Sequence, residues 1–140
     1  MLRAVVDTNV IFAALYSNAG ASYRLLQLLV GGHWKLVISN VLLAEYEEVL
    51  KRNVSSLGMS VQQLEDFLDS LCAIAERHHL KSQWIPILDD PDDEAQVHLA
   101  SEASTDYIVT HNLKHLNPAR TLGIQVITPK EFLTILKDLP

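Results

Sequence analysis

The sequence contains one cysteine, Cys72, and no apolar stretch long enough to cross a membrane. One cysteine excludes a disulfide framework and a cysteine-based zinc site. Because Cys72 lies at helical spacing among leucines, we expect it to be a small core residue. A membrane-spanning helix needs about 18 or more apolar residues, and the longest candidate is interrupted by Gly-Gly-His at 31–33. The N-terminus also lacks a signal-peptide pattern, so we expect a cytoplasmic protein.

Basic residues are scarce relative to acidic ones. There are 11 Lys and Arg against 17 Asp and Glu, which gives a formal net charge of −6. This balance argues against nonspecific nucleic-acid binding, which depends on Lys and Arg against phosphates. It does not exclude a nuclease, because acids that hold a metal lower the net charge and the bound ion restores positive charge locally. A basic partner protein would also suit such a surface.

The length and hydrophobic content favour one domain over residues 1–140 with a substantial core. Short apolar runs alternate with helical patterns, which predicts a three-layer α/β/α sandwich around a central parallel sheet of four or five strands. The stretch 78–88 is ambiguous, and Pro86 argues against a central strand there. Strands are predicted at 2–6, 35–38, 107–110 and 124–128, a short helix or turn at 9–16, and helices at 20–30, 40–52, 60–77, 91–103 and 129–138.

Each of the four apolar runs ends in a residue that carries a side-chain oxygen. These residues are Asp7, Ser39, Thr110 and Thr128. Parallel α/β sheets place their chemistry outside the carboxyl ends of the strands, so the four side chains are expected at one edge. Asp7 could instead cap the following helix. Since its neighbours in sequence could cap that helix equally well, Asp7 remains available to face the edge.

Two helices can bring further carboxylates to Asp7. Glu45 is the only acid on the apolar arc of helix 40–52, where a carboxylate is costly unless it is paired or bound to a metal. The alternative is that Glu45 reaches past the helix edge or pairs with Arg52. Three carboxylates that converge from a strand end and two helices suit Mg²⁺, which takes oxygen ligands. Such an ion activates water and holds phosphate, so phosphodiester hydrolysis is the predicted reaction.

The run 89–94 supplies the third carboxylate and packs five acids into six residues. Asp90 is a good N-cap, and acids in a first turn complement the helix dipole. One or two acids meet that need, however, and five repel one another unless a cation is bound. Both Asp92 and Asp93 fall within the apolar arc of the helix, so periodicity leaves the choice between them open. Glu94 is expected to be solvated.

Several segments together resemble the PIN-domain family, and in particular its compact VapC-like members, the toxin components of toxin–antitoxin pairs. The resemblance covers essentially the whole chain and implies an α/β/α sandwich with metal-dependent ribonuclease activity. It also implies an RNA substrate, an antitoxin partner and a homodimer. The segments that carry it are 5–10 (VVDTNV), 39–46 (SNVLLAEY), 90–93 (DPDD), 106–116 (DYIVTHNLKHL) and 126–133 (VITPKEFL).

By this resemblance, Asp7, Glu45 and Asp93 would bind Mg²⁺ or Mn²⁺ and carry catalysis. Asp93 is preferred to Asp92 because it matches the last acid of the family's Asp-Pro-x-Asp pattern. The family often has a fourth acid where this chain has Asn112, which implies one well-held ion rather than two. Possible rim or substrate contacts are Thr8, Asn9, Thr110, Asn112 and Lys114.

Other interpretations remain open at the level of sequence. His111, Lys114 and His115 follow Thr110 and form either a solvated loop or a phosphate contact. Asn112 and the acidic charge are compatible with a PIN-like fold that has lost catalysis and serves as a binding or assembly module. A receiver-like signalling domain is a further alternative, because Lys130 follows the last predicted strand. Receivers, however, need an Asp at the end of a middle strand, and Ser39 stands after the second one.

Overall fold

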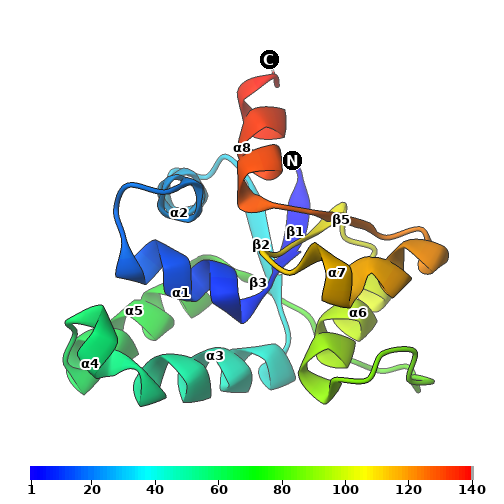
Figure 1. Ribbon diagram of the computed structural model, residues 1–140, viewed down its shortest axis with the longest axis horizontal. Helices are drawn as coiled ribbons and strands as arrows, with labels where there is room; N and C mark the ends of the chain where they lie inside the picture. The colour runs from blue at the N-terminus through cyan, green and yellow to red at the C-terminus, as the bar shows by residue number, and fades with distance from the viewer. Residues whose placement is uncertain (140) are drawn as a thin grey trace.

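A five-stranded parallel sheet forms the centre of the computed structural model, which describes residues 1–139 except for the side chain of Asp92. The strand order is β3-β2-β1-β4-β5, and every neighbouring pair is parallel. Figure 1 shows the helices around these strands. Helices flank the sheet in a three-layer α/β/α arrangement, as the sequence predicts. The strands are β1 (Arg3–Val6), β2 (Lys35–Ile38), β3 (Glu76–Arg77), β4 (Tyr107–Val109) and β5 (Gln125–Ile127).

Helices α2 and α8 pack against each other, while α6 lies against β1 and β4. The helices bury apolar surface against the strands, which are apolar on both faces, as is usual for a parallel sheet enclosed by helices. The helical elements are α1 (Thr8–Tyr16), α2 (Ala21–Val30), α3 (Asn40–Arg52), α4 (Val54–Leu57), α5 (Val61–Ile74), α6 (Pro91–Ala103), α7 (Leu113–Leu116), the 3₁₀ helix η1 (Asn117–Leu122) and α8 (Pro129–Lys137).

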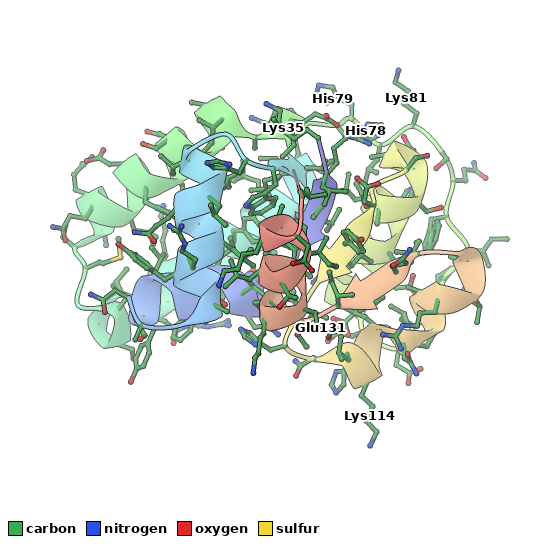
Figure 2. All side chains as sticks on the ribbon, turned by 90° about the horizontal axis from the view of Figure 1, so that it is seen from above. Lys35, His78, His79, Lys81, Lys114 and Glu131 are labelled. Atoms are coloured by element: carbon green, nitrogen blue, oxygen red, sulfur yellow. The ribbon has the colours of Figure 1, made fainter. Side chains whose placement is uncertain are left out.

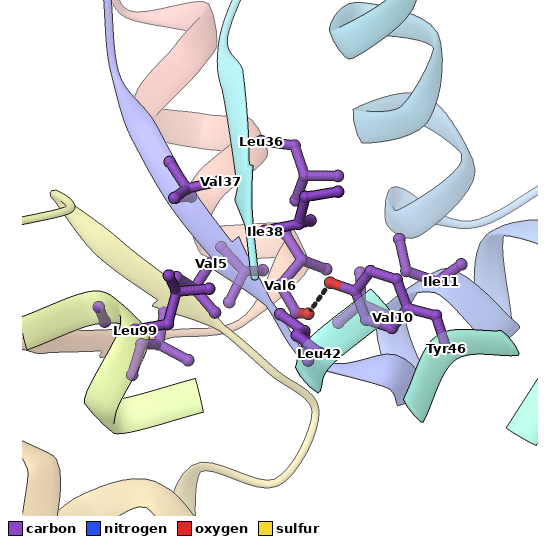
Figure 3. Close-up of a cluster of buried hydrophobic side chains, with 14 of the residues drawn as sticks. Val5, Val6, Val10, Ile11, Leu36, Val37, Ile38, Leu42, Tyr46 and Leu99 are labelled. Atoms are coloured by element: carbon purple, nitrogen blue, oxygen red, sulfur yellow. Dashed lines mark hydrogen bonds between the residues drawn. The ribbon is translucent and has the colours of Figure 1, made fainter. Parts of the chain in front are cut away.

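The core lies where β1 and β2 meet α1, α3 and α6, and Figure 3 shows its central side chains. Val5, Val37 and Leu42 are fully buried there. On α8, Phe132 packs edge-to-face on Trp34 with ring centroids 5.2 Å apart. The register of β1 and β4 comes from their backbone pairing, in which Val6 lies opposite Val109, and the candidate site is built just beyond these two residues.

Helix starts agree closely with the sequence patterns. The Ser39 hydroxyl accepts a hydrogen bond from the backbone N–H of Leu42 and caps α3. Ser60 and Gln63 form the expected capping box at the start of α5. Helix α8 begins at Pro129, where a missing N–H costs nothing because the first helical N–H groups have no intrahelical partner.

Two predictions about the middle of the chain are wrong. Helix α5 ends at Ile74 rather than near Arg77, because Glu76 and Arg77 pair with β2 as the fifth strand. The Arg3 guanidinium donates to the Glu76 carboxylate and ties this strand to the sheet. The segment between β4 and β5, predicted to be a loop, forms α7 and the 3₁₀ helix η1.

The strands at both edges of the sheet are short. β3 has two residues and β5 has three. At β5 the Ile127 carbonyl faces β4, where it accepts from Thr110, so the Val126 carbonyl faces outward. The Arg120 side chain donates to that Val126 carbonyl at 2.6 Å. No helix within residues 1–139 is long and apolar enough to cross a bilayer.

Candidate metal centre

The carboxylate of Asp7 lies at the carboxyl end of β1, where it is held by two neutral donors. Asp7 occupies the N-cap position of α1, but its side chain makes no capping hydrogen bond. Instead, its Oδ1 accepts from Gln96 Nε2 at 2.9 Å and its Oδ2 accepts from Thr110 Oγ1 at 2.7 Å. Only 7% of Asp7 is exposed. The alternative role as a helix cap is therefore excluded, and Asp7 points to the edge of the sheet.

Glu45 lies on α3 beside Tyr46, and Tyr46 connects this helix to β1. The Tyr46 hydroxyl is fully buried and donates to the carbonyl of Val6, the residue before Asp7 (Figure 3). Burial raises the pKa of Tyr46 well above its ordinary value, and the negative charges of Asp7 and Glu45 raise this pKa further. Both carboxylates therefore act on the same phenol, and Glu45 is half-buried there. Arg52, the alternative partner, lies 3.7 Å from Glu48.

Asp93 lies in the first turn of α6, three residues before Gln96. Residues three apart on a helix are neighbours on one face, and Gln96 contacts Asp7 directly. Asp93 therefore lies on the side of α6 that faces the end of β1. Its side chain is 16% exposed, and its Oδ2 lies 3.9 Å from His115 Nδ1. The competing candidate, Asp92, falls outside the described side chains.

The residues predicted at the rim of the site differ in how deeply they are buried. Thr8 is buried, and its Oγ1 has no hydrogen-bond partner among the described residues. The Asn9 side chain accepts from the His111 N–H at 3.3 Å. Asn112 is exposed, and its backbone N–H donates to Thr110 Oγ1 at 2.9 Å. Thr110 thus links the loop after β4 to the Asp7 carboxylate.

A pocket of about 390 Å³ opens beside Asp93. Figure 2 shows Lys114 extending from α7 away from the body of the protein, on the opposite side from His78, His79 and Lys81. The pocket combines three carboxylates with one lysine, one histidine and an apolar wall. It is lined by Ile87, Leu88, Asp89, Asp90, Asp93, Lys114, His115 and Pro118.

The donor set suits a hard divalent cation, which prefers carboxylate and amide oxygens. Asp7 contributes a buried carboxylate. The side-chain oxygens of Thr8, its neighbour in sequence, and of Gln96, which donates to it, are buried without hydrogen-bond partners among the described residues. Within that same part of the chain, no three His, Cys, Asp or Glu side chains are close enough to hold a metal by themselves. A cation held at the Asp7 carboxylate would therefore need neutral oxygens and water among its ligands.

Two residues of α6 were not anticipated from the sequence. Glu94, predicted to be solvated, instead accepts hydrogen bonds from the Trp84 indole at 2.5 Å and from the N–H groups of Ile87 and Leu88. That prediction is wrong because Glu94 holds the segment that leads into α6. Gln96 contacts Asp7 although no motif marks it. Its position one turn after Asp93, on a buried face, was the available signal.

The sequence model of the PIN domain matches residues 3–114 of this chain. The chain belongs to the PIN-domain family. The resemblance seen in the sequence is thereby confirmed at the level of the family. A comparison with curated protein sequences gives no match for this chain.

Two solved structures share the fold of this PIN domain. One is VapBC2 from Rickettsia felis bound to a DNA fragment from their promoter, with a TM-score of 0.63 and 17% identity over 91% of this chain and 98% of the other. The second is a PilT N-terminus domain protein from the archaeon Sulfolobus solfataricus P2. It has a TM-score of 0.55 and 15% identity over 99% of this chain and 97% of the other.

The sheet order separates this PIN domain from a receiver. In the flavodoxin-like order of receivers, the first strand lies between the second and the third. Here β1 lies between β2 and β4, and β3 is at the edge. The receiver-like alternative is therefore set aside.

Proposed function

We propose that this PIN-domain protein is a metal-dependent endoribonuclease that hydrolyses RNA phosphodiester bonds. Asp7, Glu45 and Asp93 are the proposed metal-binding and catalytic residues, with Mg²⁺ or Mn²⁺ as the ion. The observation that carries the proposal is the buried Asp7 carboxylate, which Gln96 and Thr110 hold at the end of β1. A buried carboxylate is costly unless it is hydrogen-bonded and paired with a positive charge. The two donors to Asp7 are neutral, and a hard cation would supply the positive charge.

The residues of the proposed site have different roles. Two hydrogen bonds orient Asp7, so its carboxylate oxygens already have a fixed direction before an ion binds. Tyr46 ties α3, the helix that carries Glu45, to the end of β1 through its hydrogen bond to Val6. Lys114 and His115 line the pocket beside Asp93 and are the proposed contacts to phosphate groups of the RNA. When bound, the ion supplies a water of lowered pKa and positive charge for the phosphate.

Asn112 stands at the loop after β4 and brings no charge to the site. We therefore propose one well-held ion, since a second would lack a carboxylate from this loop. The structural similarity to VapBC2 supports the further proposal that this chain is the toxin of a toxin–antitoxin pair with a protein antitoxin. A homodimer and a cytoplasmic location complete the proposal.

The test is RNA cleavage with Mg²⁺ or Mn²⁺ by the wild type and by Asp7→Asn. The substitution keeps the shape of the side chain and removes its charge. We expect the rate of cleavage to fall by about a hundredfold or more, since even partners of metal ligands typically matter 10–100-fold. Asp69→Asn, an exposed acid on α5, is the matched control and should cleave like the wild type. Unchanged cleavage by Asp7→Asn would refute the proposal.

The second candidate, a binding or assembly module without catalysis, is favoured only by Asn112 and the acidic net charge. Calorimetry with Mn²⁺ separates the two. Binding of one ion per chain that Asp7→Asn abolishes supports the nuclease. A wild type that binds no Mn²⁺ at millimolar concentration and leaves RNA intact supports the module.

A further inference from the structure

Gln96 carries a polar side chain in a fully buried position. None of its surface is exposed, and its Nε2 donates to Asp7 Oδ1 at 2.9 Å. Its other terminal atom, Oε1, has no hydrogen-bond partner among the residues that the structure describes. A buried carbonyl oxygen without a donor costs about 1–3 kcal/mol. Native proteins rarely keep such a group without a reason.

The orientation of the Gln96 amide follows from its partner. An ionised carboxylate only accepts hydrogen bonds, so the amide nitrogen must face Asp7 and the amide oxygen must face away from that contact. Turning the amide over would set Oε1 against Asp7 Oδ1 and exchange a hydrogen bond for a repulsion. The contact with Asp7 therefore fixes the orientation of the Gln96 amide and leaves its oxygen without a donor.

The position of Gln96 on α6 brings its side chain close to two of the proposed metal-binding acids. Asp93 lies one turn earlier on the same face of the helix, and Asp7 lies directly opposite. Amide carbonyl oxygens are ordinary ligands of hard divalent cations, alongside carboxylates and water. A neutral oxygen also adds a ligand without adding repulsion to a site that already collects several acids.

We propose that Oε1 of Gln96 is a further, neutral ligand of the divalent ion that the Asp7 carboxylate helps to hold. This inference rests on the proposed function, because it concerns the same ion. It gives Gln96 two tasks at once: its amide nitrogen orients Asp7, and its amide oxygen contacts the ion. Helix α6 then contributes both a charged group, Asp93, and a neutral group to one coordination shell.

The experiment measures Mn²⁺ affinity by calorimetry for the wild type and three variants. Gln96→Met keeps the length of the side chain and removes both polar atoms. Gln96→Glu keeps an oxygen in place and loses the N–H donor. Thr110→Val removes only the hydroxyl that donates to Asp7 Oδ2. It therefore reports what losing one donor to Asp7 does by itself.

We expect Gln96→Met to weaken Mn²⁺ binding about tenfold or more and Thr110→Val to weaken it less. Gln96→Glu should bind at least as tightly as the wild type. Without metal it should unfold at a lower temperature, because two carboxylates then adjoin. If Gln96→Glu binds as weakly as Gln96→Met, the N–H alone matters and the ligand role is wrong. Wild-type affinity in Gln96→Met also overturns it.

A direct measurement on the wild type covers the case in which Gln96→Met does not fold. In protein labelled with ¹³C-glutamine, Mg²⁺ should shift the Cδ resonance of Gln96 in a saturable step, and no shift would overturn the inference. The outcomes also separate the two proposals. A wild type that neither binds Mn²⁺ nor cleaves RNA refutes both. A wild type that does both, with Gln96→Met unaffected in Mn²⁺ binding, refutes only the role of Gln96.

Discussion

The hydrogen bond from Tyr46 to Val6 gives a prediction whose size follows from the structure. Tyr46→Phe removes one hydroxyl from a fully buried ring and leaves the packing of the ring unchanged. Because the Val6 carbonyl then loses a buried donor, unfolding should become easier by about 1–3 kcal/mol. In a domain of this size each kcal/mol corresponds to about 3 °C in the melting temperature. The expected decrease is therefore about 3–10 °C.

The same substitution has a pH signature. The pKa of Tyr46 is raised in the folded protein, first by burial and then by Asp7 and Glu45. A group with a raised folded pKa contributes stability that is complete below its unfolded pKa and is lost as the pH rises. Above pH ~10 the unfolded wild type releases this proton and the native protein does not. The advantage of the wild type over Tyr46→Phe should then shrink by up to about 1.4 kcal/mol per pH unit.

Urea unfolding followed by circular dichroism between pH 7 and pH 11 measures both effects. Tyr16→Phe is the control, since Tyr16 is 65% exposed. Equal stability of Tyr46→Phe and the wild type at pH 7 would refute the reasoning. A difference that stays constant up to pH 11 would show that the buried hydroxyl does not hold its proton as inferred.

Three further substitutions test the packing and charge of the fold, each by urea unfolding. Ser60→Ala should cost about 1 kcal/mol by removing the cap of α5, whereas Ser56→Ala, at an exposed site in α4, should cost less. Leu64→Ala removes a fully buried side chain and should cost about 2–5 kcal/mol. The Glu102 carboxylate accepts from Ser82, which lowers the pKa of Glu102. The stability that the ionised Glu102 contributes is therefore present above the ordinary glutamate pKa and is lost in acid. The Glu102→Gln variant should be less stable than the wild type at pH 7. This difference in stability should shrink as the pH falls below about 4.

Local patterns predict most of this fold. Each of the four predicted strands is found, and α6 spans 91–103 as its periodicity indicates. The strand ends also carry the central contact of the candidate site. Asp7 and Thr110 each follow an apolar run, and the parallel sheet brings their side chains to 2.7 Å. Such features are predictable because strand polarity and helix periodicity are set by residues close in sequence.

Features that depend on distant partners are not predictable in this way. β3 is a strand because Glu76 and Arg77 pair with Val37 and Ile38 of β2, 39 positions earlier in the chain. Glu94 is held by Trp84 and by the irregular segment that follows it, whose path no periodicity describes. Gln96 occupies a core position that pattern analysis assigns to an apolar residue, and only the approach of Asp7 explains its amide.

The short outer strands constrain how this protein can assemble. A long bare strand invites another chain to extend the sheet by backbone pairing. Here one outer strand has two residues, and Arg120 already occupies the outward carbonyl of Val126 on the other. Intermolecular β-sheet growth is therefore disfavoured at both edges. Dimers or complexes with a partner protein are expected to form through helix faces and loops, so their strength should depend on side-chain chemistry.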